Sequence, residues 1–342
     1  MSNRILIIYH SEDNDGRVSG VLCRISMERR FKDSEITCKG YTYAQLSELI
    51  NKFDSINDFI KSLQCEYDKI ILTDISFNES EVMSLLYKEY KDCFYWFDHH
   101  IPAVKTSFEK GYNEAPGFRV LGTCSAIKCV WEYLFNELYS DADNENIPKL
   151  LNTLSAYDSF KWEQHSTTFD FCNYINKGFN VESQCDFEKT YNIIKDLLNN
   201  INTTHLNWPT IKEQTLLMNC YTIGKALVDA EVIDNKELIK QWGDCSFTLD
   251  NGNKCCVLFN QSNLNSTSFK SLIETDIKHG IVFKRIPYTD NYTISLYNIN
   301  NKETFNCGEY LKKKYKGGGH TGAAGATIKQ SIFNKIMKSK II

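Results

Sequence analysis

The sequence lacks any run of apolar residues long enough to cross a membrane. A spanning helix needs about 20 consecutive, mostly apolar residues, and the 342-residue chain contains no such stretch. Its start, "MSNRILIIYH", carries a single Arg and a short apolar run, unlike a secretory signal. With 42% apolar and 13% aromatic residues, the composition is that of a globular protein. We therefore expect a cytoplasmic protein that binds no membrane.

Closely spaced cysteine pairs are also absent. The 13 cysteines are scattered and odd in number, and none forms a Cys-x-x-Cys pair. Disulfide frameworks belong mainly to secreted proteins, and structural zinc sites need clustered thiolates. We expect reduced thiols and no structural zinc.

The chain has no excess of positive charge. Its formal net charge is −4, whereas a protein that follows a long duplex needs an extended basic surface. A long-duplex partner is therefore not expected, and a phosphate substrate must be held locally. The one basic run, "KKKYK" at 312–316, directly precedes three glycines. It indicates either such a local patch or a solvated helix face.

Strand and helix patterns alternate in the first half of the chain. The sequence predicts strands over 4–9, 36–41, 69–76 and 93–98, and helices over 18–31, 56–63 and 79–90. This alternation is typical of an α/β domain with a mainly parallel sheet and helices on both faces. Further helices are expected over 123–138, from Pro148 toward 158, and over 188–199 and 211–230.

Strand patterns return near the C-terminus. The segment 245–260 predicts a hairpin with Asn251 and Gly252 at its turn. Two strands, over 280–286 and 292–298, and a helix over 306–314 follow. We expect a smaller second α/β domain, and set the boundaries at 1–200 for the first domain, 201–240 for a helical connector and 241–342 for the second domain.

Acidic residues follow three of the predicted strands. Asp13 and Asp15 follow the first strand, Asp74 ends "ILTD" and Asp98 ends "YWFD". Ligands of open parallel sheets gather at the carboxyl ends of the strands, so these acids are expected at one edge. Imidazoles and carboxylates without thiolates suit Mn²⁺ or Mg²⁺. Together with Asp158 of "SAYDSF" they are too many for one ion, which predicts two ions that activate a water for attack on phosphorus.

These residues also have simpler explanations. Asp13 or Asp15 could cap the following helix, although one cap needs only one residue. Asp74 and Asp158, taken alone, are ordinary acids at the ends of elements. His10 could be a strand-end histidine bonded to the backbone. Three aromatic residues in strands, Tyr9, Tyr95 and Trp96, are expected to pack in the core rather than stack on a base.

Five motifs in order carry a family resemblance. The segments "HSEDNDG", "LTDIS", "WFDHH", "SAYDSF" and "GGGHTGAAG" resemble those of the DHH/DHHA1 phosphoesterases. That family includes nanoRNases, pAp phosphatases, cyclic-dinucleotide phosphodiesterases, RecJ-type exonucleases and family II inorganic pyrophosphatases. The resemblance spans nearly the whole chain. It implies an N-terminal DHH domain that holds the metals, a C-terminal DHHA1 domain that binds substrate, and a cleft between them.

The resemblance also implies a role for each residue of these motifs. One Mn²⁺ would be bound by His10 and Asp13 and the other by Asp15, His99 and Asp158, with Asp74 bridging. Asp98 would orient His99 or His10, and His100 would face the phosphate, so the catalytic group would be Asp74, Asp98 and His100.

Candidate substrate-binding residues lie in the second domain. Glycines 317–319 let the backbone approach an anion closely and present its N–H groups. By resemblance, Gly318, Gly319 and His320 belong to the substrate loop; the alternative is a glycine turn with a structural role. Arg285 could hold a phosphate or could be a surface residue of a strand.

The sequence therefore predicts a Mn²⁺- or Mg²⁺-dependent phosphoesterase. Its substrate would be a short single-stranded oligonucleotide or a small nucleotide, and it would act as a monomer or homodimer. Pyrophosphate hydrolysis is one alternative, although a compact anion calls for more Lys and Arg than the glycine motif brings. A catalytically silent nucleotide sensor is the other, although every metal motif keeps its acid.

Overall fold

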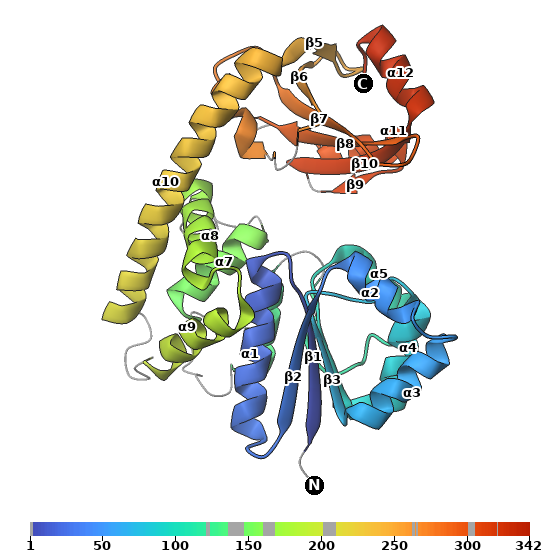
Figure 1. The fold of residues 1–342 in the computed structure, drawn as a ribbon, viewed down its shortest axis with the longest axis vertical. Helices are drawn as coiled ribbons and strands as arrows, with labels where there is room; N and C mark the ends of the chain where they lie inside the picture. The colour runs from blue at the N-terminus through green and yellow to red at the C-terminus, as the bar shows by residue number, and fades with distance from the viewer. Residues whose placement is uncertain are drawn as a thin grey trace. The chain divides into compact units, whose positions relative to one another are not determined.

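The computed structural model divides into two compact units, Met1–Lys225 and Ala226–Ile342, shown in Figure 1. It describes residues 3–120, 124–135, 147–159, 168–200, 210–261, 264, 266–299, 305–319 and 321–342. The division falls within the long helix α10 (Ile211–Trp242). This helix overlaps the range expected to be a connector.

The first unit is built on a four-stranded parallel sheet in the order β2-β1-β3-β4. The strands are β1 (Arg4–His10), β2 (Glu35–Tyr41), β3 (Lys69–Thr73) and β4 (Phe94–Phe97). In β1 the central residues 5–9 are all buried, which is typical of a strand covered on both faces. The predicted α/β architecture with a parallel sheet is confirmed.

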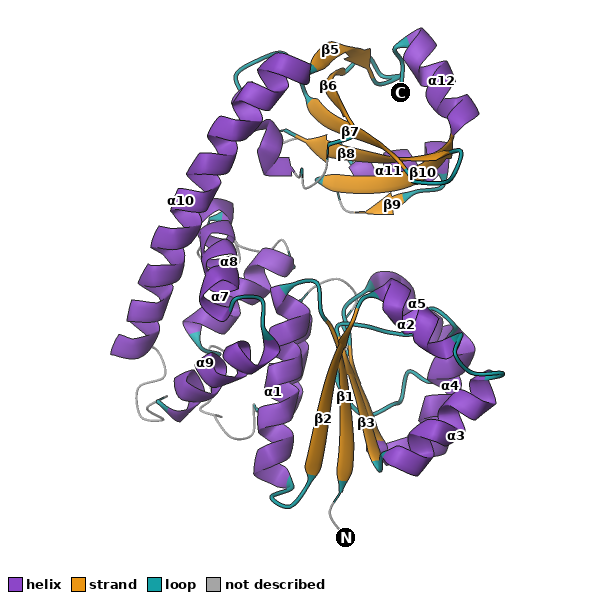
Figure 2. Cartoon of the chain, in the orientation of Figure 1, coloured by secondary structure: helices purple, strands orange, loops and turns teal. Residues whose placement is uncertain are grey.

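Helices cover both faces of this sheet, as Figure 2 shows. They are α1 (Asn14–Arg30), α2 (Tyr43–Ile50), α3 (Ile56–Glu66), α4 (Ser80–Tyr90), α5 (Ile101–Lys110), α6 (Ala126–Leu134), α7 (Lys149–Asp158), α8 (Phe169–Ser183) and α9 (Phe187–Asn199). A 3₁₀ turn, η1 (Lys91–Cys93), precedes β4.

Alternate residues of β1 enter two separate cores. Ile5 and Ile7 pack with residues of α1, α6, α7, α8 and α9, while Leu6 and Ile8 pack with residues of α2, α3 and α4. Successive side chains of a strand point to opposite faces, so one strand supplies both cores. Fully burying such a side chain contributes about 1.5 to 3 kcal/mol.

Several boundaries differ from the predicted ones. Helix α1 begins at Asn14, four residues before the predicted start, because Asp13 caps it through a hydrogen bond from the Gly16 N–H. Strand β3 ends at Thr73 because Asp74 adopts φ +58°, outside the strand region. In the first unit, helices α2, α5 and α8 were not predicted.

The second unit contains a six-stranded sheet in the order β5-β6-β7-β8-β10-β9. The strands are β5 (Asp244–Thr248), β6 (Lys254–Phe259), β7 (His279–Arg285), β8 (Asn291–Asn298), β9 (Gly318–Gly319) and β10 (Ala323–Lys329). The helices are α11 (Cys307–Tyr315) and α12 (Gln330–Ser339), with a 3₁₀ helix, η4 (Ser266–Leu272). The predicted hairpin is confirmed as β5-β6, with Gly252 at φ +86°.

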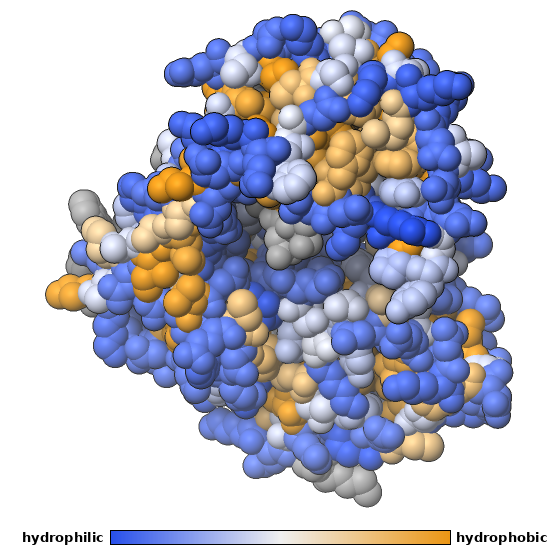
Figure 3. All heavy atoms as spheres, turned by 45° about the horizontal axis from the view of Figure 1, so that its top comes forward, coloured by the Kyte–Doolittle hydropathy of each residue, from blue (hydrophilic) through white to orange (hydrophobic). Residues whose placement is uncertain are grey.

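The visible face in Figure 3 is mostly hydrophilic, with apolar residues showing between the polar ones. Large apolar side chains are exposed at several positions of α10: Ile211, Met218, Leu227, Ile233 and Trp242. Within the described part of the chain, no helix has the length and apolar character needed to cross a membrane.

Candidate metal centre

The six predicted metal ligands lie at the ends of elements in the first unit. His10 ends β1, Asp13 caps α1, Asp15 lies in the first turn of α1, Asp74 follows β3, His99 follows β4, and Asp158 ends α7. Because the carboxyl ends of parallel strands share one edge of the sheet, three of these elements deliver their side chains to the same place.

Asp74 lies between two imidazoles. Its Oδ1 is 3.2 Å from His99 Nε2, and its Oδ2 is 3.6 Å from His10 Nδ1. The residue is 2% exposed. Its positive φ is rare for a residue with a Cβ and is held here by a hydrogen bond from its N–H to the Phe97 carbonyl, 2.9 Å long. The two oxygens of Asp74 therefore face different histidines.

Three carboxylates surround one nitrogen of His99. His99 Nε2 lies 3.2 Å from Asp74 Oδ1, 3.4 Å from Asp158 Oδ2 and 3.6 Å from Asp15 Oδ2. A single ring N–H can donate to only one of them. Asp158 Oδ2 is buried and accepts no hydrogen bond within the described part of the chain. The His99 N–H therefore cannot supply hydrogen bonds to all of the buried carboxylate oxygens around it.

The donor atoms fit hard divalent cations. Ligands about 2.1 Å from an octahedral ion lie about 3 Å from one another. Three sets of donor atoms lie within 4.8 Å of each other: His10 with Asp13 and Asp74, Asp15 with His99 and Asp158, and Asp74 with His99 and His100. Oxygen and imidazole donors without thiolates favour Mn²⁺ or Mg²⁺.

The cluster shifts the pKa values of two of its histidines and two of its aspartates upward. Burial alone would lower the pKa of His10 and of His99, but hydrogen bonds and charges of the neighbouring acids outweigh it and raise each to about 11. Burial raises the pKa of Asp15 to about 7, with the charge of Asp74 adding to the effect. Burial and the charge of Asp15 also raise the pKa of Asp158. The cluster thus has more negative charge than its own residues balance.

Asp13 and Glu12 orient His10 from its two sides. Asp13 Oδ2 lies 3.0 Å from His10 Nδ1, while Asp13 Oδ1 accepts the N–H of Gly16. Asp13 therefore caps α1 and reaches the site at the same time. Glu12 Oε2 lies 3.2 Å from His10 Nε2. Glu12 was not predicted, although it stands inside the same motif.

Asp15 is held by the start of another helix. Its oxygens accept the N–H of Ala126 at 2.7 Å and the N–H of Ile127 at 2.9 Å, the first two N–H groups of α6. A helix N-terminus carries partial positive charge and suits a carboxylate. Asp15 thus caps a helix, but not its own, and its position depends on α6.

Asp98 holds His100 rather than the ring of His99 or His10. Its Oδ1 accepts the His100 Nδ1–H at 2.8 Å and the N–H groups of His99 and His100, and its Oδ2 accepts the Trp96 Nε1–H at 3.1 Å. Burial would raise the pKa of Asp98, but the bond from His100 outweighs it and lowers the pKa. The His100 side chain is 39% exposed. Asp98 therefore fixes a histidine that solvent can reach.

Tyr43 contacts the site and was not predicted. Its ring centroid lies 5.6 Å from that of His10, with the two rings tilted, and 6.2 Å from that of His100, in an edge-on arrangement. Burial raises the pKa of its hydroxyl, which is hydrogen-bonded to Ser76. Tyr43 belongs to α2, a helix that was not predicted, although Thr42 and Gln45 form a capping box at its start.

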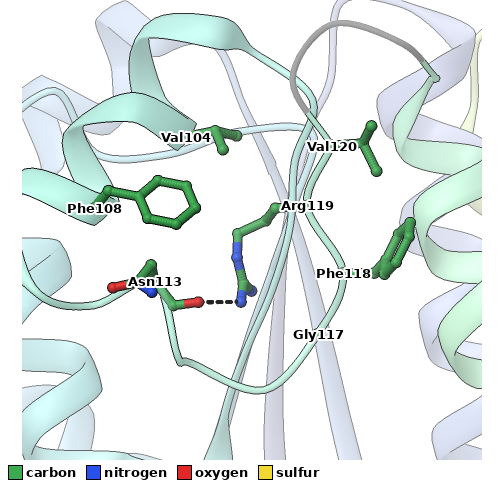
Figure 4. A pocket seen from close by; sticks show the side chains of 7 residues that line it. All are labelled: Val104, Phe108, Asn113, Gly117, Phe118, Arg119 and Val120. Atoms are coloured by element: carbon green, nitrogen blue, oxygen red, sulfur yellow. Dashed lines mark hydrogen bonds between the residues drawn. The ribbon is translucent and has the colours of Figure 1, made fainter.

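A separate pocket of about 440 Å³ lies beside β4, shown in Figure 4. It is lined by Val104, Phe108, Asn113, Gly117, Phe118, Arg119 and Val120. The Arg119 guanidinium donates to the carbonyls of Trp96, Asn113 and Ala115 at 2.6–2.8 Å. The backbone of Arg119 forms a bridge with Asp98. Arg119 thus holds its segment against β4, directly beside Asp98.

The candidate substrate residues lie in the second unit. Gly318 and Gly319 form β9 and pair with Gly325 and Ala324 of β10. The small residues 323–326, most of them inside the motif, therefore lie in strand β10 and not in a loop. A Cβ on Gly319 would lie 2.5 Å from the Ala324 Cα, whereas one on Gly318 would meet open space. Close packing of β9 against β10 thus gives a structural reason for glycine at position 319.

Arg285 and His320 complete the predicted set. Arg285 ends β7 and is exposed, and its N–H donates to Asn260 Oδ1 at 3.2 Å. His320 lies outside the described residues.

Comparison with known proteins gives a structural likeness without a sequence match. No family model and no curated protein matches the chain. A pGpG-specific phosphodiesterase, PggH of Vibrio cholerae, has a TM-score of 0.48 and 12% identity, covering 99% of this chain and 97% of that one. An exopolyphosphatase-related protein of Bacteroides fragilis has a TM-score of 0.46 and 11% identity, with 99% and 91% covered.

A third solved structure is an exonuclease RecJ bound to manganese. It has a TM-score of 0.44 and 13% identity, covering 99% of this chain and 89% of that one.

Proposed function

We propose that the first unit is the catalytic part of a metal-dependent phosphoesterase of the DHH/DHHA1 kind, with two divalent cations, Mn²⁺ or Mg²⁺. The position of Asp74 between two histidines is the observation that supports this proposal. One of its oxygens faces His99 at 3.2 Å and the other faces His10 at 3.6 Å. A carboxylate shared by two ligand groups is what two neighbouring ions need.

The ligand sets follow from the two sides of Asp74. His10 and Asp13 would hold one ion, and Asp15, His99 and Asp158 the other. When bound, such ions lower the pKa of a coordinated water and neutralise charge on the phosphoryl oxygens. The first two amides of α6 hold the Asp15 carboxylate in place by hydrogen bonds.

His100 would bind the phosphate. Asp98 fixes the ring through Nδ1, and the side chain is partly open to solvent. Burial lowers the pKa of His100, but the charge and hydrogen bond of Asp98 outweigh it and raise the pKa. This shift favours the charged imidazolium, which can donate to a phosphoryl oxygen.

The substrate would be a short single-stranded oligonucleotide or a small nucleotide. The net charge of −4 speaks against a long polyanion. The second domain, proposed at 241–342 after a connector at 201–240, would bind the substrate, and its candidate contacts are Gly318, Gly319, Arg285 and His320. Gly318 is the glycine of this pair whose Cβ position is open.

One assay panel tests the proposal. Purified protein is incubated with Mn²⁺ and labelled di- to penta-ribonucleotides, the matching DNA, pAp, cyclic dinucleotides and pyrophosphate. We expect hydrolysis of short oligonucleotides or small nucleotides that stops with excess chelator and returns when Mn²⁺ is restored. An Asp54→Asn variant, altered at an exposed acid in the turn between α2 and α3, should keep the wild-type rate.

Three results would contradict the proposal. Turnover that persists in excess chelator would exclude the metal mechanism. Cleavage of pyrophosphate alone would assign a different substrate. Nucleotide binding without hydrolysis, at saturating Mn²⁺, would identify a sensor instead of an enzyme.

A further inference from the structure

Helix α6 begins with a capping arrangement that brings two cysteines together. Ser125 is its N-cap and accepts the Lys128 N–H at 3.4 Å. Cys124 precedes the cap, and Cys129 is the fourth residue of the helix. Side chains at these two positions commonly pack against each other across the first turn. Here both are thiols.

The two sulfur atoms are already in contact. Cys124 Sγ and Cys129 Sγ lie 3.3 Å apart. A disulfide has an S–S length of about 2.05 Å, so the sulfurs need to approach by little more than 1 Å. Cys124 is 8% exposed and Cys129 is fully buried. A small reagent would therefore reach Cys124 first.

This thiol pair adjoins two residues of the metal centre. The N–H groups of Ala126 and Ile127, between the cysteines in the chain, hold both oxygens of Asp15. On the other side, Cys129 Sγ lies 3.9 Å from the carbonyl oxygen of Asp98. Any movement of the helix start is thus passed to Asp15.

We propose that Cys124 and Cys129 form a reversible disulfide in response to peroxide, and that this bond displaces the two amides that hold Asp15. The bond itself depends only on the contact between the thiols. Its effect on metal binding rests on the proposed function.

The oxidation balances with hydrogen peroxide as the oxidant. The Cys124 sulfur attacks one peroxide oxygen and the O–O bond breaks, which leaves a sulfenic acid, while the departing hydroxide takes the thiol proton and becomes water. The Cys129 sulfur then attacks Cys124 Sγ, the S–O bond breaks, and the second hydroxide takes the Cys129 proton. Two thiols lose two electrons and two protons, and one peroxide becomes two waters. A dithiol reverses the bond by exchange.

Trypsin makes the bond easy to detect. It cleaves after Arg119, Lys128 and Lys149, so the two cysteines fall in separate peptides, 120–128 and 129–149. The reduced full-length protein is treated with stepwise amounts of peroxide, blocked with an alkylating reagent and digested without reductant. We expect the two peptides to be found linked, and the link to disappear with dithiothreitol.

Two variants serve as controls for the peptide map. Cys129→Ala should abolish the linked pair, while Cys65→Ser, which removes an exposed thiol at the end of α3, should keep it. Recovery of both peptides in alkylated form, while exposed thiols such as Cys65 and Cys185 are oxidised, would overturn the proposal. The cysteines would then be an apolar contact only.

Calorimetric titration with Mn²⁺ tests the effect on Asp15. Loss of groups that orient a metal ligand typically weakens binding about 10- to 100-fold, and we expect that loss in the oxidised protein, with recovery in dithiothreitol. Cys129→Ala should bind Mn²⁺ equally before and after peroxide. A linked pair with unchanged affinity would refute the coupling to Asp15. Absence of Mn²⁺ binding in the reduced protein would instead refute the proposed function, while the peptide map would still decide whether the disulfide forms.

Discussion

Asp98 holds His100 through a single oxygen, which accepts both the ring Nδ1–H at 2.8 Å and the backbone N–H at 2.9 Å. With the N–H of His99 and the Trp96 indole, four donors converge on one fully buried carboxylate. Every partner of Asp98 in this group is a donor. The site therefore requires an ionised acid at this position, and His100 receives its orientation and its charge from it.

Replacing Asp98 by Asn should affect both stability and His100. The amide adds an N–H group among donors and leaves a buried hydrogen bond unmade, which costs about 1 to 3 kcal/mol in free energy of unfolding. The pKa of His100, raised in the wild type by Asp98, should fall. Urea denaturation measures the first effect, and an NMR titration of the imidazole measures the second. An unchanged His100 titration would show that Asp98 does not set its charge.

Replacing Asp74 by Asn should abolish hydrolysis and leave the fold intact. The amide keeps the shape of the side chain but cannot balance the charge of two ions. We expect calorimetry to show loss of at least one Mn²⁺ site, and circular dichroism to match the wild type. A variant that keeps normal rates would place the reaction elsewhere. The exposed acid Asp54, changed to Asn, again provides the matched control.

The sequence predicted much of this site because of the sheet topology. Parallel strands end at one edge, so acids after three strands had to meet. The contacts it did not predict come from tertiary packing. The amides of Ala126 and Ile127 contact Asp15 across more than 100 residues. Tyr43 lies on the short helix α2, whose capping box marks where the helix begins but not what the helix contacts. Every residue except proline has a backbone N–H group, so the sequence does not show which of these groups will bind a carboxylate.

The second unit shows a different limit. The motif "GGGHTGAAG" reads as an anion-binding loop when its glycines are counted, but close backbone packing needs glycine as well. The small residues 323–326 belong to β10, which pairs with β8 in an antiparallel register. Sequence alone could not separate the two uses of glycine.

Metal binding should release protons. His10 and His99 have pKa values of about 11 in the isolated chain, so both are protonated at pH 7 to 9, and an imidazole must lose its proton to bind a metal. Calorimetry in two buffers of different ionisation enthalpy should show release of at least two protons, because the raised pKa values of Asp15 and Asp158 add to the release from the histidines. His10→Gln should reduce the release by about one. No proton release in the wild type would contradict the assignment of these ligands.

The same histidines should make the metal-free protein less stable at high pH. Their folded pKa values lie above the unfolded value of about 6.5, so their contribution to stability is fully present below pH 6.5 and is lost as the pH rises toward 11. In chelator, we expect Tm to fall between pH 7 and 10, and added Mn²⁺ to oppose the fall. A Tm that rises over this range in chelator would contradict the prediction.

Removing the ring of Tyr43 should loosen both neighbouring histidines, whereas removing its hydroxyl should not. The ring contacts His10 and His100, and the hydroxyl is bonded to Ser76. Tyr43→Ala should therefore weaken Mn²⁺ binding and broaden the His10 and His100 signals in NMR spectra. Tyr43→Phe should retain the wild-type spectra. Equal behaviour of the two variants would show that the ring does not position the imidazoles.

Variants at two adjacent glycines of the second unit can distinguish a role in substrate binding from a role in folding. Gly319→Ala should destabilise the protein, because the new Cβ would lie 2.5 Å from the Ala324 Cα and the φ of +142° disfavours a side chain. Gly318→Ala has open space for its Cβ, so Tm should stay within a degree or so of the wild type. If residue 318 approaches the phosphate, this neutral change should still raise KM for a dinucleotide while kcat and the Mn²⁺ titration stay as they are. A KM that does not change in Gly318→Ala, together with a lowered Tm in Gly319→Ala, would assign the glycine pair to strand packing alone.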